Sequence, residues 1–552
     1  MAMTTGNEPL RSHERRSRDK RDAGRLEASQ RLRAVALVLV LLAGILLAGA
    51  FVHPRSAAVL SSAPGGQLPS VSLTPSAAVE WECPGPLPAG SSADRSSVII
   101  VNPDVKPASV EIQVEAVTVG SRKGGHALPP SRTQMSLGPR SEQVVPLATT
   151  GPAQDDAVSV LATAGAVAVF ESVAAVPLPP PVRHHGSARQ ALLSIAPLES
   201  PCTTGATTSS YVAAGSTAGQ SDVIVSLFDP TATQAVAAIR VSTGSAVITP
   251  PALQGLIVKP YSLQIFNLSR WVVQQPDVAV AVSTTIGRVA LGAAETVASD
   301  PTAATAMNGQ ALLVGVAVPE DTWVMTPGLG QITRTVSVDV YDPGPRPATV
   351  TIASPVLGRP LTEISVVVPA GLVREVELPL PTAGSPVGNE PLPVEGPIVI
   401  RTAEGVGVVV ARVAVQHLGP HTETVALAAG TAQPSDGWVV PVTAGSATTT
   451  VPRLSGGLVF SNPGSEPAVL RISELTTASG SSSLQQLSTL TLAGGSSAKV
   501  VLRLPIAGAD FAGLIVDSGT PIVAEQDFYA LGTVQHPVPV APVPTLGVAV
   551  TG

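Results

Sequence analysis

Residues 460–470, FSNPGSEPAVL, repeat a sequence motif that first occurs at residues 100–110 as IVNPDVKPASV. Two further copies lie between them, VSLFDPTATQAVAAI around Pro230 and VDVYDPGPRPATVTI around Pro343. The prolines of the four copies, at 103, 230, 343 and 463, are separated by 127, 113 and 120 residues. Regular spacing on the scale of a domain indicates that one structural unit is repeated four times.

Each copy has the composition of a turn between two strands. Apolar and β-branched residues precede and follow it, an Asn or Asp side chain can hydrogen-bond the backbone two residues on, and Pro presets φ for the next position. An isolated Asp-Pro pair could also serve as a calcium ligand, but four copies in one local context favour a structural turn. The predicted turn formers are Asn102, Pro103, Asp229, Pro230, Asp342, Pro343, Asn462 and Pro463.

Other signals keep the same register in every copy. About twenty residues before each Asx-Pro pair stands one aromatic residue, and about sixty residues after it stands a glycine between valine-rich runs. Aromatics are only 3% of the chain, so their regular placement favours a buried core position over an exposed platform for sugar rings. The aromatics are Trp81, Tyr211, Trp323 and Trp438, and the glycines are Gly165, Gly287, Gly405 and Gly519.

These patterns predict an all-β protein made of four tandem immunoglobulin-like β-sandwich repeats after a single N-terminal transmembrane helix. A β-propeller is the alternative, although its repeats are nearer 40 to 50 residues. The expected organisation is a basic cytoplasmic tail (1–33), a transmembrane helix (34–52), a stalk linker (53–80), β-sandwiches at 81–175, 205–300, 310–430 and 435–534, and a Pro-rich tail (535–552).

The membrane segment rests on AVALVLVLLAGILLAGAFV, residues 34–52, which holds no charge and is long enough to span about 30 Å of hydrocarbon as a helix. Nine basic and five acidic residues precede it, so the positive-inside rule places the N-terminus in the cytoplasm and the bulk of the chain outside. The sequence Ala48-Gly49-Ala50 leaves a cleaved signal peptide as the alternative.

Residues 53–552 carry 23 basic and 34 acidic side chains, which argues against nucleic acid as a partner. The only two cysteines, Cys83 and Cys202, both lie in this part of the chain. An even number of cysteines in an oxidising compartment predicts one disulfide between them, with two unpaired buried thiols as the alternative.

No catalytic motif is present: there is no G-x-S-x-G, H-E-x-x-H, P-loop or G-x-G-x-x-G in a suitable context. His417 and His421 have a spacing that can hold a metal, but no third ligand is near them in the sequence. We therefore predict no catalytic residues, no metal site and no cofactor.

The basic tail, the single apolar segment and the valine-rich repeats with Asx-Pro turns resemble an actinobacterial family of membrane-anchored, β-rich envelope proteins of unknown function. The resemblance implies a cell-envelope role and leaves the activity unassigned. We expect a non-catalytic scaffold or docking surface at the cell membrane, with other envelope proteins or cell-wall polymers as partners. A carbohydrate-binding or peptidoglycan-binding protein is the alternative, and an enzyme hidden in one divergent repeat is a third.

Overall fold

The computed structural model describes residues 69–73, 78–85, 96–118, 131–147, 154–173, 198–213, 215–300, 303, 305–328, 333–354, 362–378, 396–419, 422–441, 454–476, 483–503, 511–530 and 543–551. The chain divides into two compact units, 1–60 and 61–552, and every described residue belongs to the second. Within these ranges no helix is long and apolar enough to cross a bilayer. The tail at 1–33 and the apolar segment at 34–52 lie outside the described residues.

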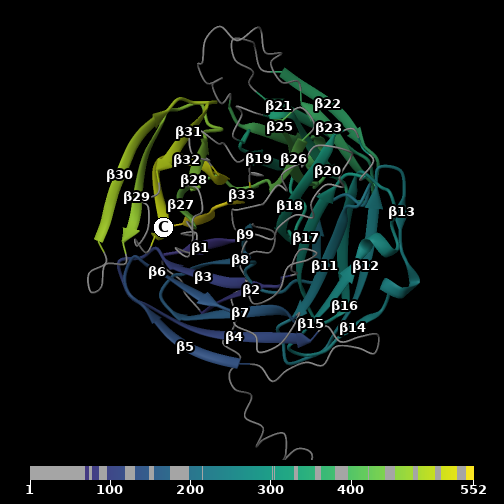
Figure 1. Ribbon diagram of the computed structural model, residues 1–552, viewed down its shortest axis with the longest axis horizontal. Helices are drawn as coiled ribbons and strands as arrows, with labels where there is room; N and C mark the ends of the chain where they lie inside the picture. The colour runs from purple at the N-terminus through teal and green to yellow at the C-terminus, as the bar shows by residue number, and fades with distance from the viewer. Residues whose placement is uncertain are drawn as a thin grey trace, which may run out of the picture. The chain divides into compact units, whose positions relative to one another are not determined.

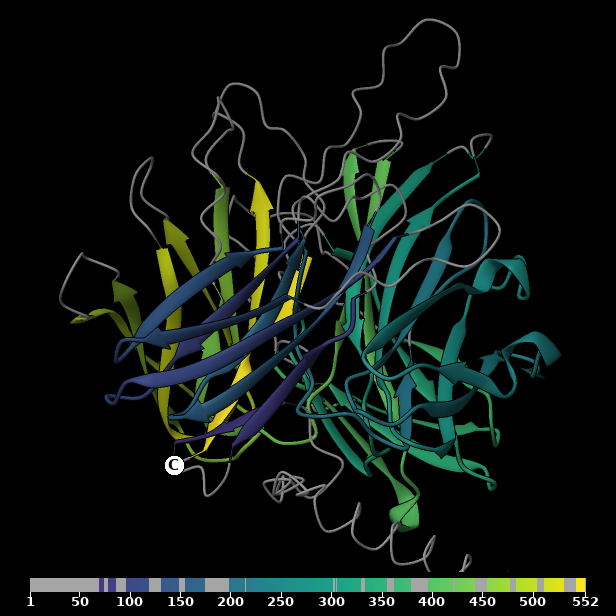
Figure 2. The same ribbon diagram turned by 90° about the horizontal axis from the view of Figure 1, so that it is seen from below.

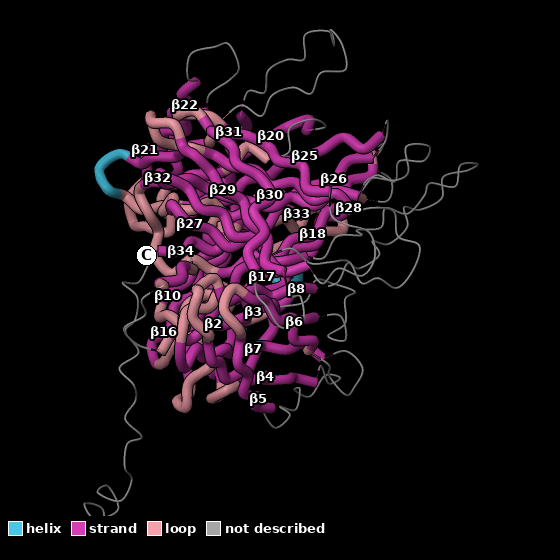
Figure 3. Tube along the Cα trace, turned by 90° about the vertical axis from the view of Figure 1, so that its left-hand side faces the viewer, coloured by secondary structure: helices cyan, strands magenta, loops and turns pink. Residues whose placement is uncertain are grey.

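The described chain is all-β, with only three short 3-10 turns, η2 (Pro251–Leu253), η3 (Leu268–Arg270) and η4 (Ala403–Gly405) (Figure 3). Its strands form four pairs of sheets that follow one another along the sequence (Figure 1). In every pair, one sheet holds the first, sixth, third and fourth strands in that order, and the other holds the fifth, second, seventh and eighth. The same strand order in all four pairs is what a fourfold repeat produces.

Sheet pair I runs from 79 to 201. Its strands are β2 (Val79–Cys83), β3 (Ser96–Asn102), β4 (Ala108–Thr118), β5 (Ser131–Leu137), β6 (Ser141–Pro146), β7 (Gln154–Ala164), β8 (Ala168–Val173) and β9 (Leu198–Pro201).

Sheet pair II runs from 209 to 314, and its fourth strand is split in two. Its strands are β10 (Ser209–Val212), β11 (Asp222–Asp229), β12 (Ala235–Thr243), β13 (Val247–Ile248), β14 (Leu256–Val258), β15 (Ser262–Asn267), β16 (Val278–Ile286), β17 (Ala290–Ala298) and β18 (Ala306–Val314).

Sheet pair III runs from 322 to 429. Its strands are β19 (Thr322–Met325), β20 (Thr333–Tyr341), β21 (Ala348–Ser354), β22 (Thr362–Val368), β23 (Val373–Leu378), β24 (Ile398–Thr402), β25 (Val409–Gly419) and β26 (Thr422–Ala429).

Sheet pair IV runs from 435 to 551, and one long strand supplies both its sixth and its seventh positions. Its strands are β27 (Ser435–Val440), β28 (Leu454–Ser461), β29 (Ala468–Thr476), β30 (Ser483–Leu492), β31 (Ser497–Arg503), β32 (Phe511–Ala530), β33 (Val543–Leu546) and β34 (Val548–Thr551). The N-terminal strand β1 (Ser70–Ser72) joins this pair by lying parallel to β34, so the C-terminal end of the chain lies beside β1 (Figure 2).

The eighth strands bring the sheet pairs together. β18 of pair II pairs in parallel with β26 of pair III, which fuses two sheets into one of eight strands. The remaining eighth strands contact one another in the order β9 with β18, β26 with β33, and β33 with β9. Contacts therefore run from each sheet pair to the next and from the last back to the first.

Three of the expected boundaries differ from the strand bounds by one strand. The expected ends at 175, 300 and 534 leave out β9, β18 and β33; β9 and β33 are distant in sequence from the preceding strand, short, and contain Pro. The predicted stalk at 53–80 contains β1, and the predicted tail at 535–552 contains β33 and β34. Both segments have the composition of linkers, and only pairing with distant strands makes them part of a sheet.

The cores fill the space between the sheets and extend across pairs. Three of the four tryptophans, at 81, 323 and 438, are 1%, 0% and 1% exposed, and the indole N–H of Trp323 donates to the carbonyl of Val408 at 2.9 Å. One hydrophobic cluster combines pairs II and III, and another combines pair I with Val439, Leu475 and Ile515 of pair IV. The expectation that the regularly placed aromatics are core residues is confirmed for these three tryptophans, whereas the fourth aromatic, Tyr211, is only partly buried.

Candidate functional site

All four Asx-Pro pairs form turns of one design between the second and third strands. In each, the side-chain oxygen Oδ1 accepts a hydrogen bond from the backbone N–H two residues on, at 2.8–3.0 Å. The donors are Asp104, Thr231, Gly344 and Gly464 for the side chains of Asn102, Asp229, Asp342 and Asn462. Pro at the next position fixes φ, so the turn is set locally before the sheets pair.

The two asparagine turns make further contacts that the aspartate turns cannot. The Nδ2 group of Asn102 donates to the carbonyls of Lys106 and Gly138 at 2.8 and 2.7 Å. The Nδ2 group of Asn462 donates to the carbonyl of Glu466 at 2.7 Å and to that of Leu492 at 3.3 Å. These asparagines therefore connect their own turn to the turn before the fifth strand, which the sequence motif did not reveal.

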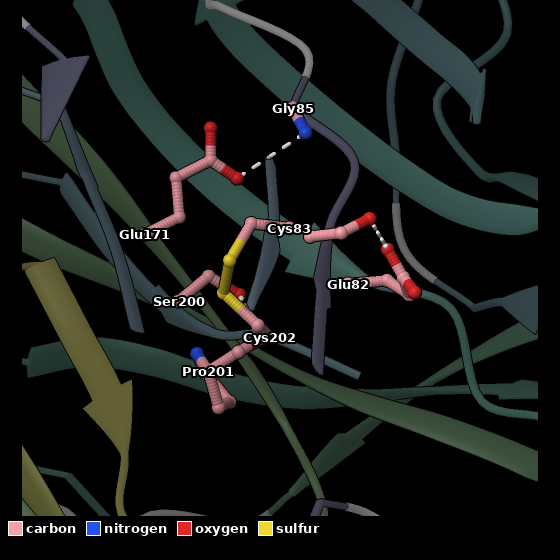
Figure 4. The surroundings of a disulfide bond; sticks show 8 residues. Glu82, Cys83, Gly85, Glu171, Ser200, Pro201 and Cys202 are labelled. Atoms are coloured by element: carbon pink, nitrogen blue, oxygen red, sulfur yellow. Dashed lines mark hydrogen bonds between the residues drawn. A yellow bond between two sulfur atoms is a disulfide. The ribbon is translucent and has the colours of Figure 1, made fainter. Parts of the chain in front are cut away.

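A disulfide joins Cys83, at the end of β2, to Cys202, directly after β9, with the Cα atoms 4.6 Å apart (Figure 4). Both cysteines are buried. The bond links the first and eighth strands of pair I, which belong to different sheets. Backbone hydrogen bonds between Glu82 and Thr203, at 2.7 and 2.9 Å, hold the two segments together beside it.

Two buried carboxylates flank the disulfide (Figure 4). Ser159 donates its hydroxyl to Glu82 at 2.6 Å, and the backbone N–H of Gly85 donates to Glu171 at 3.3 Å. Burial, repulsion from Glu80 and repulsion from Asp229 raise the pKa of Glu82 well above its usual range, against the hydrogen bond from Ser159. This carboxyl group is therefore held in its neutral form at pH values where an exposed glutamate is ionised.

The contact between pairs III and IV contains a buried ion pair. Arg412 on β25 lies with Nη2 2.5 Å from Oε1 of Glu525 on β32, and both side chains are 2% exposed. The hydroxyl of Thr326 donates to the same carboxylate at 2.6 Å, and Nη1 of Arg412 donates to the carbonyl of Thr326 at 2.6 Å. Three segments that are distant in sequence therefore meet at one charged group.

Asp527 extends this network. Burial and repulsion from Glu525 raise the pKa of Asp527 to about 7, against attraction from Arg412 and Lys499. Burial lowers the pKa of Arg412, but the attraction of Glu525 and Asp527 outweighs it and raises that pKa overall. The guanidinium therefore stays charged beside Glu525.

Other buried carboxyl groups lie where pairs II and III meet. Burial raises the pKa of Glu295 to about 8, and burial together with repulsion from Glu375 raises that of Asp339 well above its usual range. Tyr211 of pair II and Tyr341 of pair III also meet across this contact, with ring centroids 6.4 Å apart. Carboxyl groups that are buried at contacts between sheet pairs are thus a recurring feature of this chain.

The described residues offer little space for a ligand. Two concavities have volumes of about 50 and 20 Å³, and both lie near β1 beside Trp438 and Trp81 respectively. A volume of this size admits one or a few water molecules. Within the described ranges, no three His, Cys, Asp or Glu side chains are placed to hold a metal ion. The side chains of His417 and His421 lie outside what the structure describes.

No family model matches the chain, and no curated protein matches it. Among solved structures, trypsin-activated alpha-2-macroglobulin from Escherichia coli is 8% identical with a TM-score of 0.11, over 88% of this chain and 42% of the other. A tetra-tandem repeat from the extending region of a large adhesion protein is 11% identical with a TM-score of 0.09, over 87% of this chain and 98% of the other. The chain spans less than half of the macroglobulin, and TM-scores this low carry no argument about fold or function.

Proposed function

We propose that this protein is a non-catalytic scaffold of the cell envelope, held at the membrane by residues 34–52 and presenting four immunoglobulin-like β-sandwiches as a docking surface for envelope proteins or cell-wall polymers. The observation that carries the proposal is the pairing of β1 with β34. After the proposed anchor in the sequence, the chain enters the sheets of the last pair through β1 before it forms the first pair.

Contacts between the sheet pairs support a rigid scaffold. The ion pair between Arg412 and Glu525 and the hydrophobic cluster shared by pairs I and IV are buried, and β18 pairs in parallel with β26. Buried contacts of this kind oppose independent motion of neighbouring domains. Partners that dock at several sheet pairs would therefore meet a fixed spacing.

The proposed location follows from charge and apolar length. We propose that residues 1–33 are cytoplasmic and that residues 53–552 are outside the cell membrane, as in the actinobacterial envelope family that the layout resembles. A disulfide between Cys83 and Cys202 fits an oxidising compartment. Protease added to intact cells, after the outer envelope is permeabilised, should degrade residues 53–552 and spare an epitope tag placed before residue 33. Loss of that tag as well would contradict the orientation.

A crosslinking pull-down of the full-length protein from its native membrane tests the scaffold role, with a variant that lacks residues 53–552 as the control. Reproducible recovery of envelope enzymes or transporters by the full-length chain, and not by the control, is the expected result. Recovery of glycan fragments without any protein partner would overturn the scaffold and support the carbohydrate-binding alternative. Trp81, Trp323 and Trp438 are buried, so these three side chains cannot stack on the sugar rings of such a ligand.

A further inference from the structure

The contact between pairs I and IV closes the repeat on itself. We name this contact the closing seam and define it by β6 and β9 of pair I, by β29, β32 and β33 of pair IV, and by the β1–β34 pairing. Apolar residues of both pairs share one cluster here, with Val439, Leu475 and Ile515 contributed by pair IV. Because the chain joins pair IV to pair III and not directly to pair I, only noncovalent contacts hold the seam.

Two buried glutamates lie in the closing seam. The carboxylate of Glu142 on β6 accepts a hydrogen bond from the backbone N–H of Gly513 on β32. A Cβ at Gly513 would lie 3.0 Å from Oε2 of Glu142, so the glycine leaves room for this approach. Glu199 on β9 is 2% exposed, and neither of its carboxyl oxygens has a hydrogen-bond partner among the described residues.

The backbone of Glu199 is itself a seam contact. The hydroxyl of Thr545 on β33 donates to the carbonyl of Glu199 at 3.3 Å. The side chain is thus buried between the sheet pairs at the position where their eighth strands meet, and Glu142 is close enough to repel its charge. A carboxylate that is ionised in such a place, with no cation against it, destabilises the contact that buries it.

Among the described residues, no cation around the closing seam neutralises these two groups. Arg140, in the turn before β6, attracts Asp517 on β32, and Arg471 attracts the same aspartate. The titratable groups on the elements that contact β6 and β9 are Arg132 on β5, Glu171 on β8, Arg471 and Glu474 on β29, and Asp517, Glu525 and Asp527 on β32. No cation among them acts on Glu142 or Glu199, whereas Glu525 in the seam between pairs III and IV has Arg412.

We propose that the closing seam is a proton-controlled latch, closed while Glu142 and Glu199 are neutral and opened by their ionisation, whereas the seam between pairs III and IV stays closed through its ion pair. Opening separates β6 and β9 from β32 and β33 and uncovers the apolar face around Ile515. This inference does not depend on the proposed scaffold role, because it concerns only contacts within the chain.

The direction of the pH effect follows from linkage. Burial raises the pKa of Glu142 to about 8, against the hydrogen bond from Gly513, and burial together with repulsion from Glu142 raises that of Glu199 well above its usual range. In an open seam both groups return toward the ordinary glutamate pKa, about 4.3. The closed state therefore binds more protons. Its advantage is complete below the open-state pKa and is lost as pH rises through about 8.

Hydrogen exchange of the full-length protein in detergent tests the latch. Protection factors are measured at pH 5, 7 and 9, corrected for the intrinsic exchange rate, for 141–146, 513–518 and 548–551. We expect protection in these segments to fall with rising pH, by up to about tenfold per pH unit for each carboxyl. Protection of β21 and β24 in pair III, whose strands carry no carboxyl group, should not change. Uniform loss in all segments, or no loss at the seam, would overturn the latch.

Variants separate the latch from a general effect of alkaline pH. In Glu142→Gln the side-chain oxygen can still accept from Gly513, and in Glu199→Gln no hydrogen bond is lost, so the double variant should keep the seam protected at all three pH values. Glu295→Gln is the matched control, because Glu295 is buried with a pKa raised to about 8 but lies in pair II. It should open like the wild type. If the closing seam of the double variant still loses protection as pH rises, the proposal is wrong. If the double variant does not fold, the pH dependence of protection in the wild type tests the proposal by itself.

Discussion

Arg412 and Glu525 are 113 residues apart in sequence, yet their side chains form a fully buried ion pair with Nη2 and Oε1 2.5 Å apart. Arg412 belongs to pair III and Glu525 to pair IV, so the pair bridges two repeats. Thr326 completes the network with a hydrogen bond to each partner. Buried ions are costly unless they are paired and hydrogen-bonded, so the geometry of this site determines whether the contact is stable.

Removing one partner of this ion pair should destabilise the contact strongly. In Arg412→Met the carboxylate of Glu525 stays buried without its cation, and we expect the free energy of unfolding to fall by about 3–5 kcal/mol. Chemical denaturation of the full-length chain measures it. The double variant Arg412→Met with Glu525→Leu should recover most of the loss, because the carboxylate that Arg412 pairs with is removed as well and Asp527 is relieved of the repulsion from Glu525. A double variant as unstable as the single one would show that packing, and not charge, dominates here.

The Asx turns should respond in opposite ways to exchanges of Asn and Asp. In Asn102→Asp, a carboxylate oxygen replaces the amide group that donates to Lys106 and Gly138, so two acceptors face each other and stability should fall by about 1–3 kcal/mol. In Asp342→Asn, the amide group replaces Oδ2, a buried oxygen with no hydrogen-bond partner among the described residues, so no contact is lost and stability should stay the same or rise.

Thermal unfolding of both variants beside Asn102→Ala and Asp342→Ala measures these effects. If the turns need only the Oδ1 contact to the residue two positions on, the Asn–Asp exchanges would be harmless and the alanine variants alone would be unstable. That result would contradict the distinction between the two kinds of turn.

Two glycines after the sixth strand offer a matched comparison of steric crowding. Gly287 and Gly405 both have positive φ, 71° and 66°. A Cβ at Gly287 would lie 2.8 Å from the Cα of Ala235, whereas a Cβ at Gly405 would have nothing within 4 Å. We expect Gly405→Ala to cost about 1–2 kcal/mol for the left-handed backbone, and Gly287→Ala to cost about 2–5 kcal/mol because overpacking adds to it. Equal losses in denaturant unfolding would show that the backbone conformation alone matters.

The sequence was informative where structure is set locally or by the repeat. The Asx-Pro phrase predicted the turns, the regular aromatics predicted the buried tryptophans, and strand-like runs predicted an all-β fold. The eighth strands were missed because segments such as LESP at 198–201 and VPTL at 543–546 have the composition of linkers and become strands only by pairing with distant neighbours.

The buried charges at the contacts between sheet pairs could not be predicted for a related reason. Arg412, Glu142 and Glu199 stand in the segments VVARVAV, SEQVV and LESP, and nothing in these segments indicates that the charged side chain is buried. Their burial depends on another sheet pair covering that face, and the repeat itself carries no information about it, since Glu142 and Arg412 have no equivalent in every copy. In addition, an error of one residue in the predicted register of a strand would place these side chains on the opposite face of the sheet.

The disulfide between Cys83 and Cys202 should stabilise pair I mainly by restricting the unfolded chain. The two cysteines are 119 residues apart, and closing a loop of this length is worth about 4–5 kcal/mol in the chain-entropy model. Cys83→Ala with Cys202→Ala should therefore lower the free energy of unfolding by about 2–5 kcal/mol while the native strands are kept, because two small apolar side chains replace a buried bond. Denaturant unfolding of this variant, beside the wild type with and without reductant, measures the effect. The reduced wild type and the double variant should then unfold at similar denaturant concentrations. A reductant that leaves the wild type unchanged, although mass spectrometry shows two free thiols, would contradict a stabilising role for the bond.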